Sequence, residues 1–394
     1  MKPLHFFANG WGAVEDQPLD PELADHVLAW VDNPKGGPIS SAIKEGKELV
    51  IKAKDKPELR LPIPHGLVPS TMGGNTWNTW LNKNRVMNVL GTSNEALSPL
   101  HVLKTPGLER AAEGLPGPVV WREIKGARHR LSFVIQPHDS DEPIYLKQPP
   151  TPDQTGTIPD EAAVFVSSSG QDIFWHIERY REHNPDGQLI LAPGSKQIAR
   201  GVPASTLESV QWLTCNKDEA IQIAQFLDTS FPNSPSAPDF RVFFENLGIP
   251  EVRITLGGNG VYVLTEGQAF HYLGIDRHAR SLNRLFEEHD FLRGAPSNES
   301  FNGCGDVRIG TELAARDLDF KDRVTELAMA GVMATIHTFR PESNLGRYPQ
   351  DLLGHVQDLV QERTDLHRTM PIPRIDRSEK THLSLPEPAL AECG

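Results

Sequence analysis

Short apolar runs that alternate with helix-period segments constrain the fold of this chain more than any other feature of its sequence. Continuous apolar runs are typical of strands buried on both faces, and apolar residues at every third or fourth position predict helices. Strands joined by helices form parallel sheets covered on both sides, so we predict an α/β fold, a three-layer α/β/α sandwich. The expected strands lie at 162–166, 189–191, 210–213, 252–256 and 261–264, and the expected helices at 173–180, 220–227, 306–317 and 322–338.

The rest of the chain gives shorter signals that fit the same single domain. Short apolar segments separated by polar residues or glycine predict surface hairpins. Proline-rich segments without periodicity predict loops or an extended tail. We expect a strand at 5–8, a helix at 23–31, hairpins at 49–61 and 119–135, loops at 148–159 and 231–239, one domain over 1–370, and an extended tail over 371–394.

Composition and charge exclude several classes of function. The 394 residues include 39 Lys and Arg against 52 Asp and Glu, a net charge of −13, so no nucleic acid partner is expected. Cys215, Cys304 and Cys393 form no C-x-x-C pair. We therefore expect neither a disulfide framework nor a cysteine zinc site, which fits a reducing, cytoplasmic setting. No signal peptide and no apolar run of about 20 residues is visible, so no membrane association is expected.

One glycine-rich turn, Gly303-Cys304-Gly305-Asp306, stands where the helix at 306–317 begins. Glycine permits positive φ and lets a ligand approach the main chain. The first amides of a helix have no internal partner and carry roughly half a positive charge, so they bind anions. Asp306 beside such a site could take the proton of a hydroxyl that attacks a phosphoryl group. The alternative is an ordinary helix start, with Asp306 as a partner of the helix dipole.

Three further motifs precede this turn in the chain. They are G-G-x-x-x-N at 73–78, an asparagine followed three residues later by glutamate at 216–219, and T-x-G-x-x-G at 255–260. With Gly303–Asp306, where Cys304 replaces the alanine of a G-A-G-D segment, the ordered set resembles the ribokinase-like (PfkB) family of carbohydrate and nucleoside kinases. The resemblance covers roughly residues 65–345 and is poorest before residue 65.

This resemblance implies an ATP-dependent, magnesium-requiring kinase that phosphorylates a hydroxyl of a sugar or sugar-like small molecule. Asp306 is then the catalytic base, and the amides of Gly303, Cys304 and Gly305 form the anion hole. Magnesium keeps several waters and needs few protein ligands, so Asn216 and Glu219 would organise it. The nucleotide would contact Asn216, Thr255, Gly257, Gly260, Lys196 and Asn344, with His337 nearby, and the substrate would contact Gly73, Gly74, Asn78 and Asp16.

The family also has a small β-sheet lid over its substrate, and segments near 45–65 and 117–136 match the position of that lid. A lid excludes water, which competes with the substrate as phosphoryl acceptor. In some relatives the lid joins two subunits, which allows a homodimer here. The alternative is a pair of surface hairpins without gating.

Most of these residues also have an ordinary structural explanation. The alternatives are a capping box for Asn216 and Glu219, a hairpin turn for 257–260, a helix start for Gly73 and Gly74, and a surface position for Lys196.

The chain departs from the family pattern at several positions. No aspartate is evident at the end of the first strand, where Asn9 or Asp16 could serve. Ser300 and Ala192 stand where many relatives carry aspartate. Arg308 replaces an aromatic or aliphatic residue, and it either faces a phosphorylated or carboxylated substrate or points to solvent. These departures bear on the substrate more than on phosphoryl transfer.

Two other functions remain open from the sequence. A nucleoside kinase would explain Trp77 and Trp80 if they stack on a base, although tryptophans at helical spacing are more often core residues. A kinase fold retained as a binding or regulatory protein would explain the weak N-terminal match. The intact Asp306 argues against that second reading, because a lapsed site has no need of a base.

Overall fold

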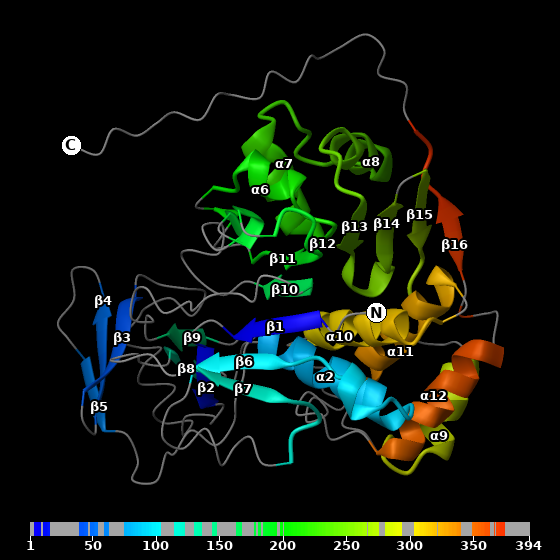
Figure 1. The fold of residues 1–394 in the computed structure, drawn as a ribbon, viewed down its shortest axis with the longest axis horizontal. Coiled ribbons are helices and arrows are strands. Elements are labelled where there is room, and N and C mark those ends of the chain that lie inside the picture. The colour runs from blue at the N-terminus through cyan, green and yellow to red at the C-terminus, as the bar shows by residue number, and fades with distance from the viewer. Residues whose placement is uncertain are drawn as a thin grey trace.

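The computed structural model has a large central sheet with helices on both faces (Figure 1). It describes residues 4–8, 11–15, 39–45, 48–53, 59–62, 75–103, 114–122, 130–135, 144–147, 163–167, 177–178, 180–182, 184–194, 198–199, 201–265, 267–275, 280–293, 303–320, 322–339, 349–362, 366 and 368–374.

The central sheet has ten strands in the order β16-β15-β14-β13-β12-β11-β10-β1-β6-β7. From β7 to β13 neighbouring strands are parallel, so their carboxyl ends lie at one edge, whereas β14, β15 and β16 continue the sheet as antiparallel neighbours. The strands are β1 (Leu4–Ala8), β6 (Leu100–Leu103), β7 (Val119–Arg122), β10 (Ala163–Ser167), β11 (Leu189–Ala192), β12 (Trp212–Asn216), β13 (Glu251–Thr255), β14 (Val261–Thr265), β15 (Gln268–Tyr272) and β16 (Thr369–Pro371).

Helices cover both faces of this sheet, which confirms the predicted three-layer α/β/α sandwich (Figure 1). One face carries α6 (Ala204–Glu208), α7 (Lys217–Leu227) and α8 (Ala237–Asn246), and the other carries α2 (Asn75–Val89), α10 (Cys304–Asp317) and α11 (Arg323–Phe339). Helices α9 (Arg280–Glu288) and α12 (Gln350–Glu362) lie outside this second layer, and short 3-10 turns occupy η1 (Asn94–Ala96) and η2 (Gly257–Asn259). No described helix has both the length and the apolar character that a membrane span needs.

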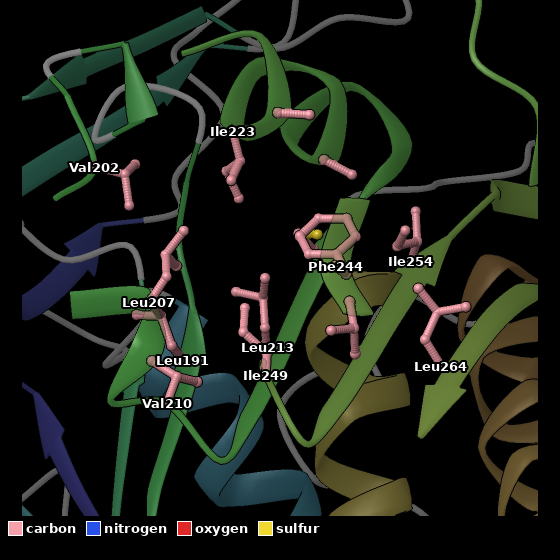
Figure 2. Close-up of a cluster of buried hydrophobic side chains, with 14 of the residues drawn as sticks. Leu191, Val202, Leu207, Val210, Leu213, Ile223, Phe244, Ile249, Ile254 and Leu264 are labelled. Carbon is pink, nitrogen blue, oxygen red and sulfur yellow. The ribbon is translucent and has the colours of Figure 1, made fainter. Parts of the chain in front are cut away.

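Alternation along the strands divides the core between the two faces. On β12, Leu213 and Cys215 point into the cluster under α7 and α8, whereas Trp212 joins the cluster under α2. Figure 2 shows the first cluster, in which Leu213 and Ile254 from the sheet meet Ile223 of α7 and Phe244 of α8. Because side chains alternate across a strand, a single strand can contribute to both layers of the core.

Two small sheets stand apart from the central one. β3 (Ile39–Glu45), β4 (Glu48–Ala53) and β5 (Leu59–Pro62) form an antiparallel sheet, so the hairpin predicted over 49–61 is confirmed. β2 (Trp11–Glu15), β8 (Arg130–Ile135) and β9 (Ile144–Lys147) form the second small sheet.

The hairpin predicted over 119–135 is wrong. Its first half is β7, which pairs with β6 at the edge of the central sheet, and its second half is β8 in a small sheet. The sequence pattern explains the error, because Val119 and Trp121 pack on the core while Val120 is exposed, as on a sheet edge.

Most of the other predicted elements are found, with some changed limits. The loop predicted over 231–239 ends early, because Ser236 and Asp239 form a capping box that opens α8. The tail predicted from residue 371 begins inside the sheet, because Pro371 pairs with Phe270 in β15. The helix predicted at 23–31 and the loop at 148–159 lie outside the described residues.

Helices α2 and α10 touch closely at Gly310. A Cβ atom at this position would lie 2.5 Å from the carbonyl oxygen of Thr79 and 2.9 Å from Cβ of Asn82. Both obstacles belong to α2, and neither is the end of a flexible side chain. The absence of a side chain at Gly310 therefore sets the distance between the two helices.

We predict that Gly310→Ala destabilises the protein, because α2 and α10 must move apart to admit the methyl group. Overpacking of this kind costs about 1–3 kcal/mol. Gly354→Ala is the matched control, because a Cβ atom at this helical position meets nothing within 4 Å. That substitution should stabilise α12 by about 0.4–1 kcal/mol. Urea denaturation of both variants measures the difference, and equal stabilities would contradict the tight contact.

Candidate active site

The first turn of α10 has the geometry of an anion site. Gly303, the residue before the helix, has φ 82 and ψ −4, a left-handed conformation that favours glycine. Gly305 is exposed, and a Cβ atom there would meet nothing within 4 Å. A ligand can therefore approach the first turn of α10 at Gly305, and the helix dipole favours a negative charge there.

Asp306 lies in this first turn and its side chain is buried. Burial raises the pKa of its carboxyl group to about 7, although a hydrogen bond from Asn78 acts in the opposite direction. Nδ2 of Asn78 donates to Oδ2 of Asp306 at 3.2 Å, across the contact between α2 and α10. A carboxylate with a pKa near neutrality is well matched to act as a general base at physiological pH.

Cys304 contributes its main chain rather than its thiol. Burial and, to a lesser extent, the neighbouring charge of Asp306 raise the pKa of this thiol to about 12. The thiol therefore stays protonated at neutral pH and is a poor nucleophile.

The ends of β12 and β13 bring two other predicted site residues together. Asn216 and Thr255 are register partners at the carboxyl ends of these parallel strands. Oδ1 of Asn216 accepts a hydrogen bond from the Glu219 amide at 2.8 Å, and Oε2 of Glu219 accepts from the Asn216 amide at 3.0 Å. The capping box anticipated as an alternative is therefore present.

The described residues near Asn216 offer few protein ligands for a magnesium ion. Among the described residues, no group of three or more His, Cys, Asp and Glu side chains is placed to hold a metal ion. Asn216 is exposed and Glu219 half-buried, and both are oxygen ligands of the kind that Mg²⁺ prefers. They fit the ion only if phosphate oxygens and water complete its shell, which is the usual arrangement for magnesium bound with a nucleotide.

The turn between β13 and β14 is a hairpin built around two required glycines. A Cβ atom at Gly260, where φ is 95, would lie 1.9 Å from the carbonyl oxygen of Tyr272. Gly257 has φ 59 and is exposed, with no atom within 4 Å of a Cβ position. The hairpin reading of 257–260 is thus correct, and the turn also leaves an open backbone surface beside Asn216 and Thr255.

Ion pairs set α10 antiparallel to β13. Glu251, at the start of β13, lies 3.4 Å from Arg316 near the end of α10, and Arg253 lies 2.8 Å from Glu312 one turn earlier. Two residues advance about 6.6 Å along a strand, and four residues advance about 6 Å along a helix. Every second residue of β13 therefore faces every fourth residue of α10. If this pairing continues, Arg308 lies level with Thr255, and Gly303–Asp306 lie beyond the carboxyl end of β13.

Two sequence-based readings of named side chains are corrected. Arg308 does not point to solvent, because it is buried, and its Nη2 lies 3.0 Å from Oε2 of Glu312. Trp77 and Trp80 cannot stack on a base, because both are buried in the core, and Trp80 donates its indole hydrogen bond to the Ser98 carbonyl at 2.6 Å. His337 is also fully buried, on α11.

Several predicted site residues lie outside the described part of the chain. They are Gly73, Gly74, Asp16 and Asn9 on the substrate side, Lys196 and Asn344 on the nucleotide side, and Ser300 before α10.

Sequence reasoning missed the charged residues between β13 and α10. Arg253 is fully buried within a strand that was predicted from its apolar character, and Glu312 lies one helical turn after Arg308. A charged residue inside a buried strand needs a partner of opposite charge, so Arg253 within an apolar run already indicated a buried ion pair.

Comparisons with known proteins identify the fold. No protein-family model matches the chain, and no curated protein sequence does either. Solved structures do match it. A ribokinase from Thermotoga maritima has a TM-score of 0.53 at 13% identity, over 79% of this chain and 91% of its own.

Two ligand-bound kinases have the same fold. A nucleoside kinase from Burkholderia thailandensis, in complex with ADP-inosine, has a TM-score of 0.51 at 15% identity, over 74% of this chain and 83% of its own. A ribokinase from Arabidopsis thaliana, complexed with ribose and ATP, has a TM-score of 0.50 at 14% identity, over 81% and 92%. The protein therefore has the ribokinase-like fold, as its ordered motifs indicated, and at these identities the likeness shows the fold alone.

We predict that Asp306→Asn stabilises the protein increasingly as pH rises. The folded-state pKa of about 7 lies above the ordinary aspartate value of 3.8, so ionisation of Asp306 in the folded state costs stability. That cost is absent at low pH and complete above the folded pKa, where it reaches roughly 4 kcal/mol. An asparagine oxygen still accepts from Asn78 and carries no such cost. Thermal unfolding of both proteins between about pH 4 and pH 8 measures the difference, and a gap that does not widen with pH contradicts the burial of an ionising Asp306.

Proposed function

We propose that this protein is an ATP-dependent kinase that phosphorylates a hydroxyl of a sugar or sugar-like small molecule. The observation that carries the proposal is the buried Asp306, with a pKa of about 7, in a first helical turn that is exposed at Gly305, where an anion can approach. A base beside an anion site is what transfer of a phosphoryl group to a hydroxyl requires. The ribokinase-like fold supports the same class of reaction.

In this mechanism Asp306 accepts the proton of the substrate hydroxyl as its oxygen attacks the γ-phosphate in line. Asn78 holds the carboxylate through Oδ2 and leaves Oδ1 for the hydroxyl. The amides of Gly303, Cys304 and Gly305 stabilise the charge that develops on the transferred group. Such fixed dipoles act strongly because they need no reorganisation during the reaction.

The nucleotide would lie along the carboxyl ends of β12 and β13. ATP bound there supplies the phosphoryl group. Thr255, Gly257 and Gly260 are its proposed contacts, and the exposed Gly257 leaves room for it to approach the main chain. Asn216 and Glu219 would hold Mg²⁺ together with phosphate oxygens and water. Lys196 and Asn344 complete the proposed nucleotide side.

The substrate would lie between α2 and the first turn of α10. Gly73, Gly74, Asn78 and Asp16 are its proposed contacts. The sheet β3-β4-β5 and strand β8 fall within or beside the segments assigned to a lid, and a lid would exclude water during transfer. We further propose a homodimer that pairs through this lid and a cytoplasmic location.

A panel of sugars and nucleosides, assayed by ADP release, tests the proposed function. We expect turnover with at least one sugar or sugar-like hydroxyl compound. A nucleoside that saturates the enzyme where no sugar does would establish the alternative, which the fold shared with a nucleoside kinase supports. Ligand binding without turnover across the whole panel would instead identify a lapsed kinase.

Asp306→Asn tests the mechanism itself. We expect turnover to fall at least about 10²-fold, because a positioned base contributes about 10²–10⁴-fold. Nucleotide affinity should be largely retained. In the wild type, kcat/KM should rise with pH through a value of about 7, because only the ionised carboxylate accepts a proton. Unchanged turnover in the variant, measured on the best substrate of the panel, would remove Asp306 from its role.

A further inference from the structure

A chain of buried charges joins the strand next to the proposed nucleotide site to the helix that carries Asp306. Arg253 of β13 lies 2.8 Å from Oε1 of Glu312, and Arg308 lies 3.0 Å from Oε2 of the same carboxylate. We call these three residues the β13–α10 array. Glu251 extends it toward the other end of both elements, 2.6 Å from Arg253 and 3.4 Å from Arg316.

All three residues of the array are buried deeply. Arg253 is 0% exposed, Glu312 1% and Arg308 7%. Burial alone would raise the pKa of Glu312, but the attraction of Arg308 and Arg253 outweighs it and lowers that pKa. The carboxylate is therefore ionised, and the array holds at least one negative and two positive charges in the interior.

Stability does not explain this arrangement well. Buried ion pairs lose solvation that their mutual attraction only partly recovers, and apolar residues of similar volume often stabilise a protein as much. Within the described part of the chain, Nη1 of Arg253 and Nη1 of Arg308 have no hydrogen-bond partner. A partly satisfied polar network is less favourable than an apolar core. Apolar clusters flank the array on both sides, so apolar side chains at these three positions would have joined them.

What the array does provide is a fixed register. Apolar surfaces allow a helix to shift along a strand at little cost, whereas a carboxylate held between two guanidinium groups does not. Two ion pairs define this register: Glu251 with Arg316, and Arg253 with Glu312. The position of Asp306 relative to the end of β13 follows directly from this register.

We infer that Arg253, Glu312 and Arg308 are positioning residues. They fix where α10 lies along β13, and so they fix the position of Asp306 and the anion site relative to the proposed nucleotide turn at 255–260. The inference rests on the proposed function. Small misplacements of a catalytic group lower the rate strongly, by about 10²-fold for 1 Å, because the reacting atoms no longer meet in line.

The main test replaces the whole array by apolar residues in the combined variant Arg253→Met, Glu312→Leu and Arg308→Met. The variant removes all three charges together, so it leaves none unpaired. We expect a melting temperature close to that of the wild type, kcat lowered about 10- to 100-fold, and the KM for ATP changed by less than about threefold. A merely structural array would leave kcat unchanged in the folded variant.

A second, milder variant keeps the inference testable if the combined variant does not fold. Glu312→Asp keeps every charge but draws the carboxylate back by one methylene group, so it cannot reach both Arg253 and Arg308 at their present distances. It too should lower kcat, by about tenfold, while the KM for ATP is kept. The control is Glu326→Gln, which removes a buried carboxylate of α11 that contacts Arg323 and touches neither Arg253 nor α10 at hydrogen-bond distance. Its kcat should equal that of the wild type.

Hydrogen exchange separates this inference from the proposed function. Amides 306–308 should exchange at least about tenfold faster in both array variants than in the wild type or in Glu326→Gln, whether or not any substrate is turned over. If the wild type is active and the array variants keep its kcat, the positioning role is refuted. If the wild type is inactive, the proposed function fails, and unchanged exchange would then refute the array's role independently.

Discussion

The contact between α10 and α2 at Gly310 determines the surroundings of Asp306, the proposed catalytic base. Because no side chain separates the helices there, Asn78 reaches Asp306, and the carboxyl group is enclosed by neighbouring side chains and loses most of its water. Desolvation then raises its proton affinity, so a base suited to neutral pH results from packing alone. The first turn of α10 stays open on its other side, at Gly305, where a negatively charged group can approach.

The same helix is held to the sheet by charge as well as by apolar packing. The face of β13 toward α10 carries Glu251 and Arg253, whereas the face toward α7 and α8 carries Val252 and Ile254 in the apolar cluster where Figure 2 labels Ile254. The two faces of one strand therefore serve different purposes. The apolar face contributes burial, and the charged face contributes a defined register, which burial alone does not specify.

The sequence predicted the layers and the Gly303–Asp306 turn because both depend on local patterns, namely apolar period and glycine-dependent backbone geometry. It could not predict which partners long-range packing supplies. The burial of Asp306 depends on a residue 228 positions earlier, Asn78 of α2. Arg308 was misjudged because its partner Glu312 is also held by Arg253, which lies on another element. β7 was assigned to a hairpin for the same reason, since pairing with β6 is visible only in three dimensions.

The pairing of Asn78 with Asp306 also has a consequence for how the chain folds. Bringing together residues so distant in sequence costs loop-closure entropy, so this contact depends on the ordering of the segments between them. Until α2 is in place, the carboxyl group of Asp306 remains hydrated and titrates like any surface aspartate. Partially folded forms thus lack a base tuned to neutral pH, and the proton affinity of this single group reports whether the two halves of the molecule have come together.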